Sequence, residues 1–363
     1  MLEIHCSGTP HEIGVTHGVL AKTQIDGSIN FYGSLFERTC SLSWPQVVHE
    51  ASRYAAPLEK LRPRYLEEIR GIAEGANLPF LDILALNVRT EIAFGLFSNA
   101  ARDAADIPSD GCTSLGWRTG GGDKAASFLG QNWDWMVEQG ANLVVCHVAR
   151  QQQRAGAEEL LPAFSMVTEA GIIGKIGFNE AGVGCCLNAI KCRGVDPSKL
   201  PIHFALRTVL ESRSRAEAVA AIKEAGVAGS GHILVGDASG STGLECTHRW
   251  VKEVPVDEAG RVCHTNHLLL DKSDVDEPPW LADSPDRLAR IRALTAAIPD
   301  PTVDALLGVF RDTEGYPASI NRKQTGGSEA ETLFTIVMDL TNRSGRVGFG
   351  RPTEAQDQVT LAF

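Results

Sequence analysis

Gly111-Cys112 is the pair of residues in this sequence best suited to covalent chemistry. It lies where a small, polar, loop-like stretch, residues 101–108, gives way to short runs of strand composition. Glycine lacks a Cβ, so the backbone before the thiol can adopt an otherwise forbidden conformation, and such strain favours attack of the thiol on the Gly111 carbonyl. The sequence therefore predicts self-cleavage of this bond through a thioester that water resolves.

Cleavage would give Cys112 a free α-amino group that can act as the base for its own thiol. The ordinary pKa of an α-amine is about 8, against roughly 10.4 for lysine, so a sizeable neutral fraction exists near pH 7. Cys112 would then be an N-terminal nucleophile that needs no histidine. The plainer alternative is a buried, inert cysteine in a turn, because reduced cysteines pack as small hydrophobes.

Three further polar groups could serve such a nucleophile. Asp134 follows Gly130-Gln131-Asn132-Trp133 and could pair with the new α-ammonium group. The side-chain amide of Asn266, in His264-Thr265-Asn266-His267, is a good donor to an oxyanion. Arg322 follows an apolar turn and can anchor a carboxylate or balance the charge of the nucleophile. Each group also has an ordinary structural explanation: a surface turn, core histidines and a surface salt bridge.

A metal site is a competing use of the Cys and His residues between positions 246 and 267. They form the pattern C-x-H…C-H-x-x-H over Cys246, His248, Cys263, His264 and His267. This spacing is not close to any common zinc pattern. The sequence therefore favours core histidines over metal ligands, and we expect no bound metal and no bound cofactor.

The composition narrows the class of protein. The chain has 363 residues with 43% hydrophobic content, enough for a sizeable core in one or two domains. The net charge is −11 and there is no Lys/Arg stripe or basic tail, so nucleic acid is not an expected partner. The chain lacks a signal-peptide pattern and any apolar run near 18 residues, so we expect a soluble cytoplasmic protein without a membrane partner.

Nine cysteines without a secretory signal predict reduced thiols rather than a disulfide framework.

Helical patterns fill the first hundred residues. Capping boxes with an early proline begin helices at Thr9 and Ser43, helical spacing of apolar residues from Tyr65 ends near Asn77, and 81–93 is expected to be one buried helix.

Alternating strands and helices complete the predicted order. The expected strands are 127–132, 143–149, 163–168, 182–187, 232–235, 244–246, 261–264, 332–339, 345–350 and 358–363, and the expected later helices are 201–210, 214–226, one from Ser284 and one from Thr302. Blocks of helices and strands of this kind indicate an α+β fold in which helices cover antiparallel sheets.

Together and in this order, these groups resemble the fungal acyl-coenzyme A:6-aminopenicillanic acid acyltransferase (isopenicillin N acyltransferase) family. The similarity spans nearly the whole chain. The blocks that carry it are Gly8-Thr9-Pro10, Glu12-Ile13-Gly14, His17-Gly18, Glu67–Ala73, Leu86-Asn87, Arg89-Thr90-Glu91, Asp110–Thr113, Gly130–Asp134, Thr168–Lys175, His264–His267 and Gly350–Thr353.

The resemblance implies an N-terminal-nucleophile hydrolase fold, a four-layer αββα sandwich with antiparallel sheets. It implies a zymogen that cuts itself, in the manner of a cysteine peptidase, into a helical segment 1–111 and a catalytic segment 112–363, which stay associated as one structural domain. The implied site residues are the nucleophile Cys112, the nearby carboxylate Asp134, the oxyanion-hole side chain Asn266 and the arginine Arg322, with Thr113, Trp133 and Ser328 in supporting roles.

The implied activity is acyl transfer. The Cys112 thiolate attacks an amide or thioester carbonyl, and the acyl-enzyme passes its acyl group to an amine such as 6-aminopenicillanic acid or to water. Acyl-coenzyme A would be a co-substrate, and the partners would be a small N-acyl or acyl-CoA substrate and the chain's own 1–111 fragment. Pure amide hydrolysis without coenzyme A is the alternative within the same chemistry.

Two departures from related enzymes affect the expected substrate. The penicillin-pathway enzyme carries a peroxisomal C-terminal tripeptide, whereas this chain ends Leu361-Ala362-Phe363, so we expect a relative outside peroxisomes. The more distant penicillin V amidase and bile-salt hydrolase relatives have arginine where this chain has Gln131. Their substrate preferences are therefore less transferable.

Overall fold

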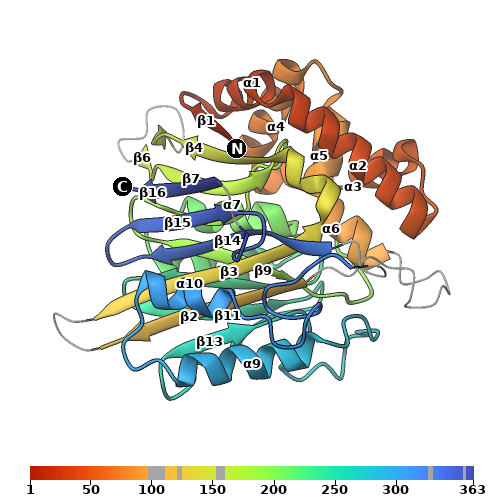
Figure 1. The fold of residues 1–363 in the computed structure, drawn as a ribbon. Coiled ribbons are helices and arrows are strands. Elements are labelled where there is room, and N and C mark those ends of the chain that lie inside the picture. The colour runs from red at the N-terminus through yellow and green to blue at the C-terminus, as the bar shows by residue number, and fades with distance from the viewer. Residues whose placement is uncertain (97–110, 121–124, 153–159, 326–329, 355–356) are drawn as a thin grey trace.

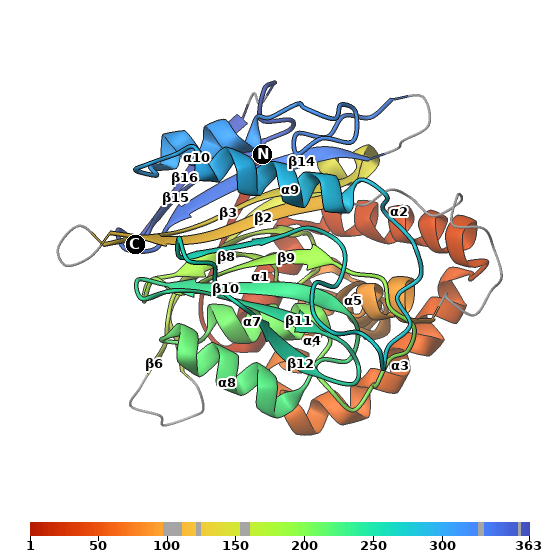
Figure 2. The same cartoon turned by 90° about the horizontal axis from the view of Figure 1, so that it is seen from below.

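Two β-sheets packed face to face form the centre of the protein (Figures 1 and 2). The computed structural model describes residues 1–96, 111–120, 125–152, 160–325, 330–354 and 357–363. The predicted loop 101–108 lies outside the described residues. No helix within these ranges is long and apolar enough to cross a membrane.

The larger sheet has eight strands. Its strand order is β1-β4-β7-β8-β9-β10-β11-β12, and all neighbours are antiparallel except β1 and β4, which are parallel. The strands are β1 (Leu2–Cys6), β4 (Leu143–Val148), β7 (Phe164–Glu169), β8 (Ile176–Asn179), β9 (Gly184–Ala189), β10 (Gly231–Asp237), β11 (Gly240–Cys246) and β12 (Val251–Val254).

The smaller sheet has six strands, all antiparallel, in the order β13-β2-β3-β14-β15-β16. They are β13 (Arg261–His264), β2 (Gly111–Thr119), β3 (Ala126–Met136), β14 (Ala330–Asp339), β15 (Ser344–Phe349) and β16 (Asp357–Ala362). A separate short pair joins β5 (Gln151–Gln152) and β6 (Leu160–Leu161).

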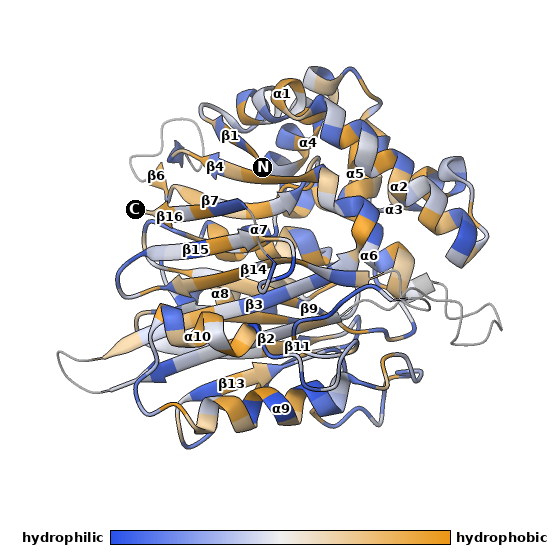
Figure 3. Cartoon of the chain, in the orientation of Figure 1, coloured by the Kyte–Doolittle hydropathy of each residue, from blue (hydrophilic) through white to orange (hydrophobic). Residues whose placement is uncertain are grey.

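Helices cover the outer face of each sheet, so the layers are helix, sheet, sheet, helix (Figure 2). On the larger sheet lie α7 (Ile202–Leu210) and α8 (Arg215–Ala225), and on the smaller sheet lie α9 (Ser284–Ala296) and α10 (Val303–Phe310). Both α9 and α10 carry polar as well as apolar residues (Figure 3), as expected for helices with one face on a sheet. The α+β class and the four-layer arrangement are thereby confirmed.

The remaining helices come from the first part of the chain, and α1 and α4 lie beside β1 (Figure 1). They are α1 (Pro10–Leu20), α2 (Lys22–Cys40), α3 (Trp44–Leu61), α4 (Pro63–Ala76), α5 (Phe80–Asn87), α6 (Arg89–Glu91) and the π-helical turn η1 (Ile92–Leu96); a 3-10 segment, η5 (Val137–Asn142), follows β3. The capping boxes predicted at Thr9 and Ser43 are confirmed, and Asn77 ends α4 in a left-handed conformation.

Two sequence predictions for this region are wrong. The first residues form a strand, Leu2–Cys6, and not part of a helix. Five residues are too few to give a recognisable strand pattern in the sequence, and pairing with β4 stabilises the strand. The single helix expected over 81–93 is broken at Val88. The Asn87 side chain bonds the backbone of Gly171 and Ile173, and the chain leaves helical geometry directly after it.

The two faces of the smaller sheet pack into different layers. In β3, Phe128 belongs to the apolar cluster beneath α9 and α10, whereas its neighbour Leu129 points at Gly236 of the larger sheet. This is the alternation that a strand imposes on successive side chains. The same alternation in β2 and β3 decides which side chains can meet at the candidate site.

Glycines set the distance between α1 and α4. A Cβ added at Gly14 would lie 2.0 Å from the Glu68 carbonyl oxygen, and one added at Gly71 would lie 2.1 Å from the His11 carbonyl oxygen. Both contacts are with backbone, which cannot turn aside as a flexible side chain does. The helix α4 in turn packs on α5, which directly precedes the short helix that carries Arg89.

We expect Gly71→Ala to lower the free energy of unfolding by about 1–3 kcal/mol, the usual cost of overpacking a tight contact. Gly33→Ala is the matched control, because nothing lies within 4 Å of an added Cβ at that position of α2. It should leave stability unchanged or raise it slightly, since alanine is the better helix former. Thermal unfolding midpoints of the two variants test this, and equal midpoints would contradict it.

Candidate active site

The pairing of β2 with β3 places the Gly111–Cys112 bond. Gly111 lies opposite Asp134, and Cys112 lies opposite Trp133. Directly opposed residues of antiparallel strands share a face, and successive residues point to opposite faces. The thiol therefore lies with Trp133 between the two sheets, whereas the Asp134 carboxylate lies on the other face, under Gly111.

The thiol lines a small cavity of ≈ 20 Å³ between the sheets, and Cys112 itself is 1% exposed. A cavity of this size holds about one water molecule. Its lining is mostly apolar and comes from both sheets and the N-terminal helices: Arg89, Thr90, Phe94, Cys112, Trp133, Trp135, Leu187 and Ala189. In the continuous chain, the space that the described residues leave beside the sulfur is thus too small for a substrate.

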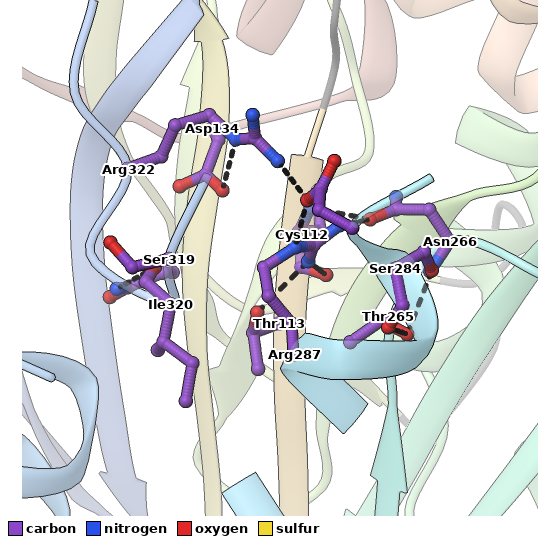
Figure 4. A network of polar contacts seen from close by, with 12 residues as sticks. Cys112, Thr113, Asp134, Thr265, Asn266, Ser284, Arg287, Ser319, Ile320 and Arg322 are labelled. Carbon is purple, nitrogen blue, oxygen red and sulfur yellow. Dashed lines mark hydrogen bonds and ion pairs between the residues drawn. The ribbon is translucent and has the colours of Figure 1, made fainter. Parts of the chain in front are cut away.

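Two side chains fix the backbone of Cys112 (Figure 4). Its N–H donates to Asn266 Oδ1 at 2.9 Å, and its carbonyl accepts a hydrogen bond from Arg287 at 2.9 Å. Arg287 also donates to Asn266 Oδ1 at 2.8 Å. Because a guanidinium can only donate, this contact determines which end of the Asn266 amide is the oxygen. The amide nitrogen donates to the Ala189 carbonyl at 3.0 Å.

A chain of alternating charges, buried except for the partly exposed Asp283, supports Arg287. Asp283, at the start of α9, accepts from Arg287 at 2.6 Å and also contacts Arg322. Arg322 Nε in turn lies 3.6 Å from Asp134 Oδ2. The sequence Asp134, Arg322, Asp283, Arg287 thus links the two sides of the Gly111–Cys112 bond with two positive and two negative groups.

Close approach is the reason for glycine at position 111. A Cβ there would lie 2.7 Å from Arg322 Nε and 2.9 Å from Asp134 Oδ2, so a side chain would displace both groups. Gly111 begins the strand β2. Packing against the Asp134–Arg322 pair is thus sufficient to exclude a Cβ at this position. A strained backbone at Gly111 stays a prediction, because its φ angle depends on residue 110, which lies outside the described residues.

Burial controls the titration of Asp134. It raises the pKa of this fully buried carboxyl from 3.8 to about 6, although Arg322 and Arg287 oppose the rise. Asp134 Oδ1 accepts from the Thr332 hydroxyl at 2.6 Å, whereas Oδ2, the oxygen nearest Gly111, has no hydrogen-bond donor among the described residues. Near neutral pH this carboxylate can accept a proton or pair with an ammonium group.

A second buried charge cluster lies behind Trp133. Glu169 contacts both Lys175 and Arg89, whose attraction outweighs burial and holds the pKa of Glu169 well below its ordinary value. Burial lowers the pKa of Lys175 to about 8, and its ammonium nitrogen lies 3.7 Å from the centre of the Trp133 ring. Two cations against one carboxylate give this side of the cavity a positive potential, which favours a thiolate.

The Cys and His residues of 246–267 have other roles. His264 Nε2 bonds Glu245 at 2.8 Å and its ring stacks on His232, so it is a core histidine. Within the described ranges, three possible ligand atoms come within 4.8 Å of one another only at Glu3, His5 and His147 on β1 and β4. The metal alternative for 246–267 therefore has no geometric support.

The structure brings together six of the residues singled out from the sequence: Cys112, Thr113, Trp133, Asp134, Asn266 and Arg322. Thr113 accepts from Arg287 at 3.1 Å. Ser328 lies outside the described residues.

Sequence reasoning missed Arg287 and Asp283, as well as the Arg89–Glu169–Lys175 cluster. The only local signal for the first pair is an Asp and an Arg four positions apart at a helix start, a pattern equally typical of exposed helix surfaces. Arg89, Glu169 and Lys175 fall within the blocks that carry the family resemblance, but their spacing in the sequence gives no sign that they meet.

The comparisons with known proteins give one family and several relatives. The family model described as acyl-coenzyme A:6-aminopenicillanic acid acyl-transferase matches residues 117–354, a range that includes Asp134, Asn266 and Arg322. The chain is 37% identical to the acyl-coenzyme A:6-aminopenicillanic-acid-acyltransferase 40 kDa form of Emericella nidulans, over 100% of this chain and 96% of that protein.

Two solved structures align at 14% identity. One is a penicillin V acylase from Agrobacterium tumefaciens, with 69% of this chain and 86% of that chain covered at a TM-score of 0.46. The other is a mutant of a conjugated bile acid hydrolase from Clostridium perfringens, with 69% and 92% covered at a TM-score of 0.46.

The raised pKa of Asp134 predicts a pH effect on stability. With Cys112→Ala as background, so that the chain stays intact, the folded protein keeps the Asp134 proton up to about pH 6, whereas the unfolded chain releases it near 3.8. Folding therefore binds a proton between these two pH values. As a result, Asp134 lowers the free energy of unfolding, by at most about 3 kcal/mol, as the pH rises through this range.

Adding Asp134→Asn should remove that fall, measured as the change in unfolding midpoint between pH 4 and pH 7. The exposed Asp26, on the surface of α2, gives the control Asp26→Asn, which should keep the pH dependence of the background. If the Asp134 variant also kept it, Asp134 would not titrate as described.

Proposed function

The chain belongs to the acyl-coenzyme A:6-aminopenicillanic acid acyl-transferase family, and from this premise we propose that it cuts itself between Gly111 and Cys112 and then uses Cys112 as its nucleophile. Membership makes it an enzyme of acyl transfer or amide hydrolysis. The observation that carries the proposal is the convergence on the two residues of this bond: Asn266 holds the Cys112 N–H, Arg287 holds the Cys112 carbonyl, and the Asp134–Arg322 pair packs against Gly111.

Self-cleavage is an acyl shift from nitrogen to sulfur. The Cys112 sulfur attacks the Gly111 carbonyl carbon, the C–N bond breaks, and the nitrogen takes up a proton in place of the one lost by the thiol. Water then hydrolyses the thioester, which gives a Gly111 carboxylate and restores the thiol. The new α-ammonium of Cys112 forms beside the buried Asp134 carboxylate, which favours its charged form.

The two segments would remain together after the cut. β1 stays paired with β4 of the second segment, and Tyr32 and Arg89 of the first segment both contact the buried Glu169. Arg207 also forms a buried double hydrogen bond with Glu68, at 2.9 and 2.6 Å. These contacts support the view that residues 1–111 and 112–363 form one structural domain.

The same groups suit acyl transfer. The freed amine takes the proton of its own thiol, and the thiolate attacks the carbonyl carbon of an amide or a thioester. The Asn266 amide nitrogen uses one N–H for Ala189, which leaves its second N–H for the oxyanion. The departing amine or thiol carries away the proton, and an amine or water then attacks the acyl-enzyme and regenerates Cys112.

The names of the relatives suggest the substrates to test first. Acyl-coenzyme A would be the acyl donor and 6-aminopenicillanic acid, or another amine, the acceptor. Hydrolysis without a coenzyme A step is the competing reaction of the same acyl-enzyme. Product analysis separates them, because transfer yields a new amide whereas hydrolysis yields only free acid.

We expect the purified protein to run as two fragments, residues 1–111 and residues 112–363, under denaturing conditions. Cys112→Ala should run as one chain, because alanine cannot form the thioester. Cys263→Ala is the matched control, since Cys263 is also buried in the smaller sheet, on the strand next to β2, and should be cut like the parent. A parent chain that stays whole after long incubation would contradict the proposal.

Asn266→Ala should lower kcat for amide formation from an acyl-coenzyme A and 6-aminopenicillanic acid by about 10²–10³-fold, the usual effect of removing an oxyanion donor. Rates are taken per cleaved molecule, because Asn266 also holds the N–H of Cys112 before the cut. Asn342→Ala, in the turn between β14 and β15, is the control and should keep parental kcat. An Asn266→Ala rate within twofold of the parent would remove Asn266 from the mechanism.

A further inference from the structure

Asn266, which bonds the Cys112 N–H, also lines a hollow of ≈ 400 Å³. Its volume is in the range of small-molecule sites. Beside three prolines, Leu281 and Ala282, its lining includes Lys191, Asn266, His267, Lys272, Glu277 and Trp280. The hollow thus combines an apolar wall with a few charged groups, as ligand sites commonly do.

Two contacts connect this hollow with the nucleophile. Asn266, which lines the hollow, accepts the hydrogen bond of the Cys112 N–H. Trp280, also in its lining, packs on Phe94 of the cavity at the thiol, with ring centres 5.1 Å apart. The hollow and the thiol cavity therefore have lining residues in direct contact, so that a substrate with its carbonyl at Cys112 could extend into the hollow.

The charges in the hollow do not balance. Lys272 is paired with Glu277, which also accepts the Leu268 N–H at 2.8 Å. Lys191 is only 6% exposed, yet no carboxylate or other acceptor among the described residues bonds its ammonium group. Burial lowers the pKa of Lys191, and the nearby Cys40 cannot neutralise it, because burial raises the pKa of that thiol to about 12.

Lys191 thus has a largely buried side chain that lines the hollow, and the described residues supply no counter-ion, so a bound anion would offset the cost of its desolvation. We propose that the hollow is a substrate subsite in which Lys191 binds an anionic group. Two sources share this chemistry: the carboxylate of the acceptor amine and the phosphates of the acyl-coenzyme A donor. Trp280 and the prolines would cover the apolar body of the same molecule. The inference rests on the proposed acyl transfer at Cys112 and adds to it the group that selects the substrate.

Steady-state kinetics of Lys191→Met tests the subsite. We expect KM for the substrate that carries the anion to rise roughly 10- to 100-fold, as for loss of a charged hydrogen bond, with kcat within about twofold of the parent. Lys191→Arg should recover most of the loss, since it restores the charge. Lys272→Met is the matched control in the same hollow and should change KM far less, because Lys272 is half exposed and already paired.

Substrate analogues distinguish the two sources. If the acceptor carboxylate binds Lys191, the KM effect falls on 6-aminopenicillanic acid and disappears with its methyl ester. If the phosphates bind, the effect falls on acyl-coenzyme A and disappears with an acyl thioester of N-acetylcysteamine. Unchanged KM values for both substrates in a variant that is still cut at Cys112 would overturn the subsite and leave the proposed function standing. Failure of the parent chain to cut itself would instead refute the proposed function.

A measurement on the unmodified protein covers the case in which Lys191→Met does not fold. Reductive methylation of the folded protein, followed by peptide mass spectrometry, reports how accessible each lysine is. Saturating 6-aminopenicillanic acid or coenzyme A should protect Lys191 and leave Lys272 labelled to the same extent as before. Equal labelling of Lys191 with and without both ligands would contradict the proposal.

Discussion

The position of the reactive bond depends on one buried guanidinium group. Arg287 donates to the Cys112 carbonyl and to the Asn266 oxygen, and Asp283 compensates its charge. Because arginine is charged at all accessible pH values and only donates, these contacts leave a single arrangement for the groups around it. The helix α9, which follows Cys112 by more than 150 residues in the sequence, thus positions both the nucleophile and its oxyanion donor.

Because side chains alternate along β2 and β3, the attacking thiol and the Asp134 carboxylate lie on opposite faces of the smaller sheet. The thiol lies between the sheets, beside an apolar cavity and the positive Lys175 group, where attack on a carbonyl is favoured. Asp134 lies on the opposite face under Gly111, where the new ammonium group would form. The two groups therefore do not compete for the same space, and a carboxylate next to the sulfur, which would disfavour the thiolate, is avoided.

Much of this could be predicted from the sequence, because local signals coincide with the structure. The capping box at Thr9 begins a helix, and Asn77 ends one. The candidate residues Cys112 and Asn266, 154 positions apart, do meet. Only the family resemblance predicted that these two residues belong to one site, because nothing in their spacing along the sequence indicates a contact.

The rest depends on tertiary contacts that leave no local pattern. From the sequence alone, Arg287 has the pattern of an exposed arginine on a helix surface. In the structure α9 packs on β2, and the Arg287 guanidinium bonds the Cys112 carbonyl. Lys191 gives no sign in the sequence that its side chain is largely buried at the edge of a hollow, without a carboxylate partner among the described residues. If Cys112 becomes an N-terminal aminothiol, 2-cyanobenzothiazole, which condenses with an adjacent amine and thiol, should label it. We expect one stable label per molecule, on a peptide that begins at Cys112. Protein that takes up no label, although its thiols still react with iodoacetamide, would show that Cys112 has no free α-amine.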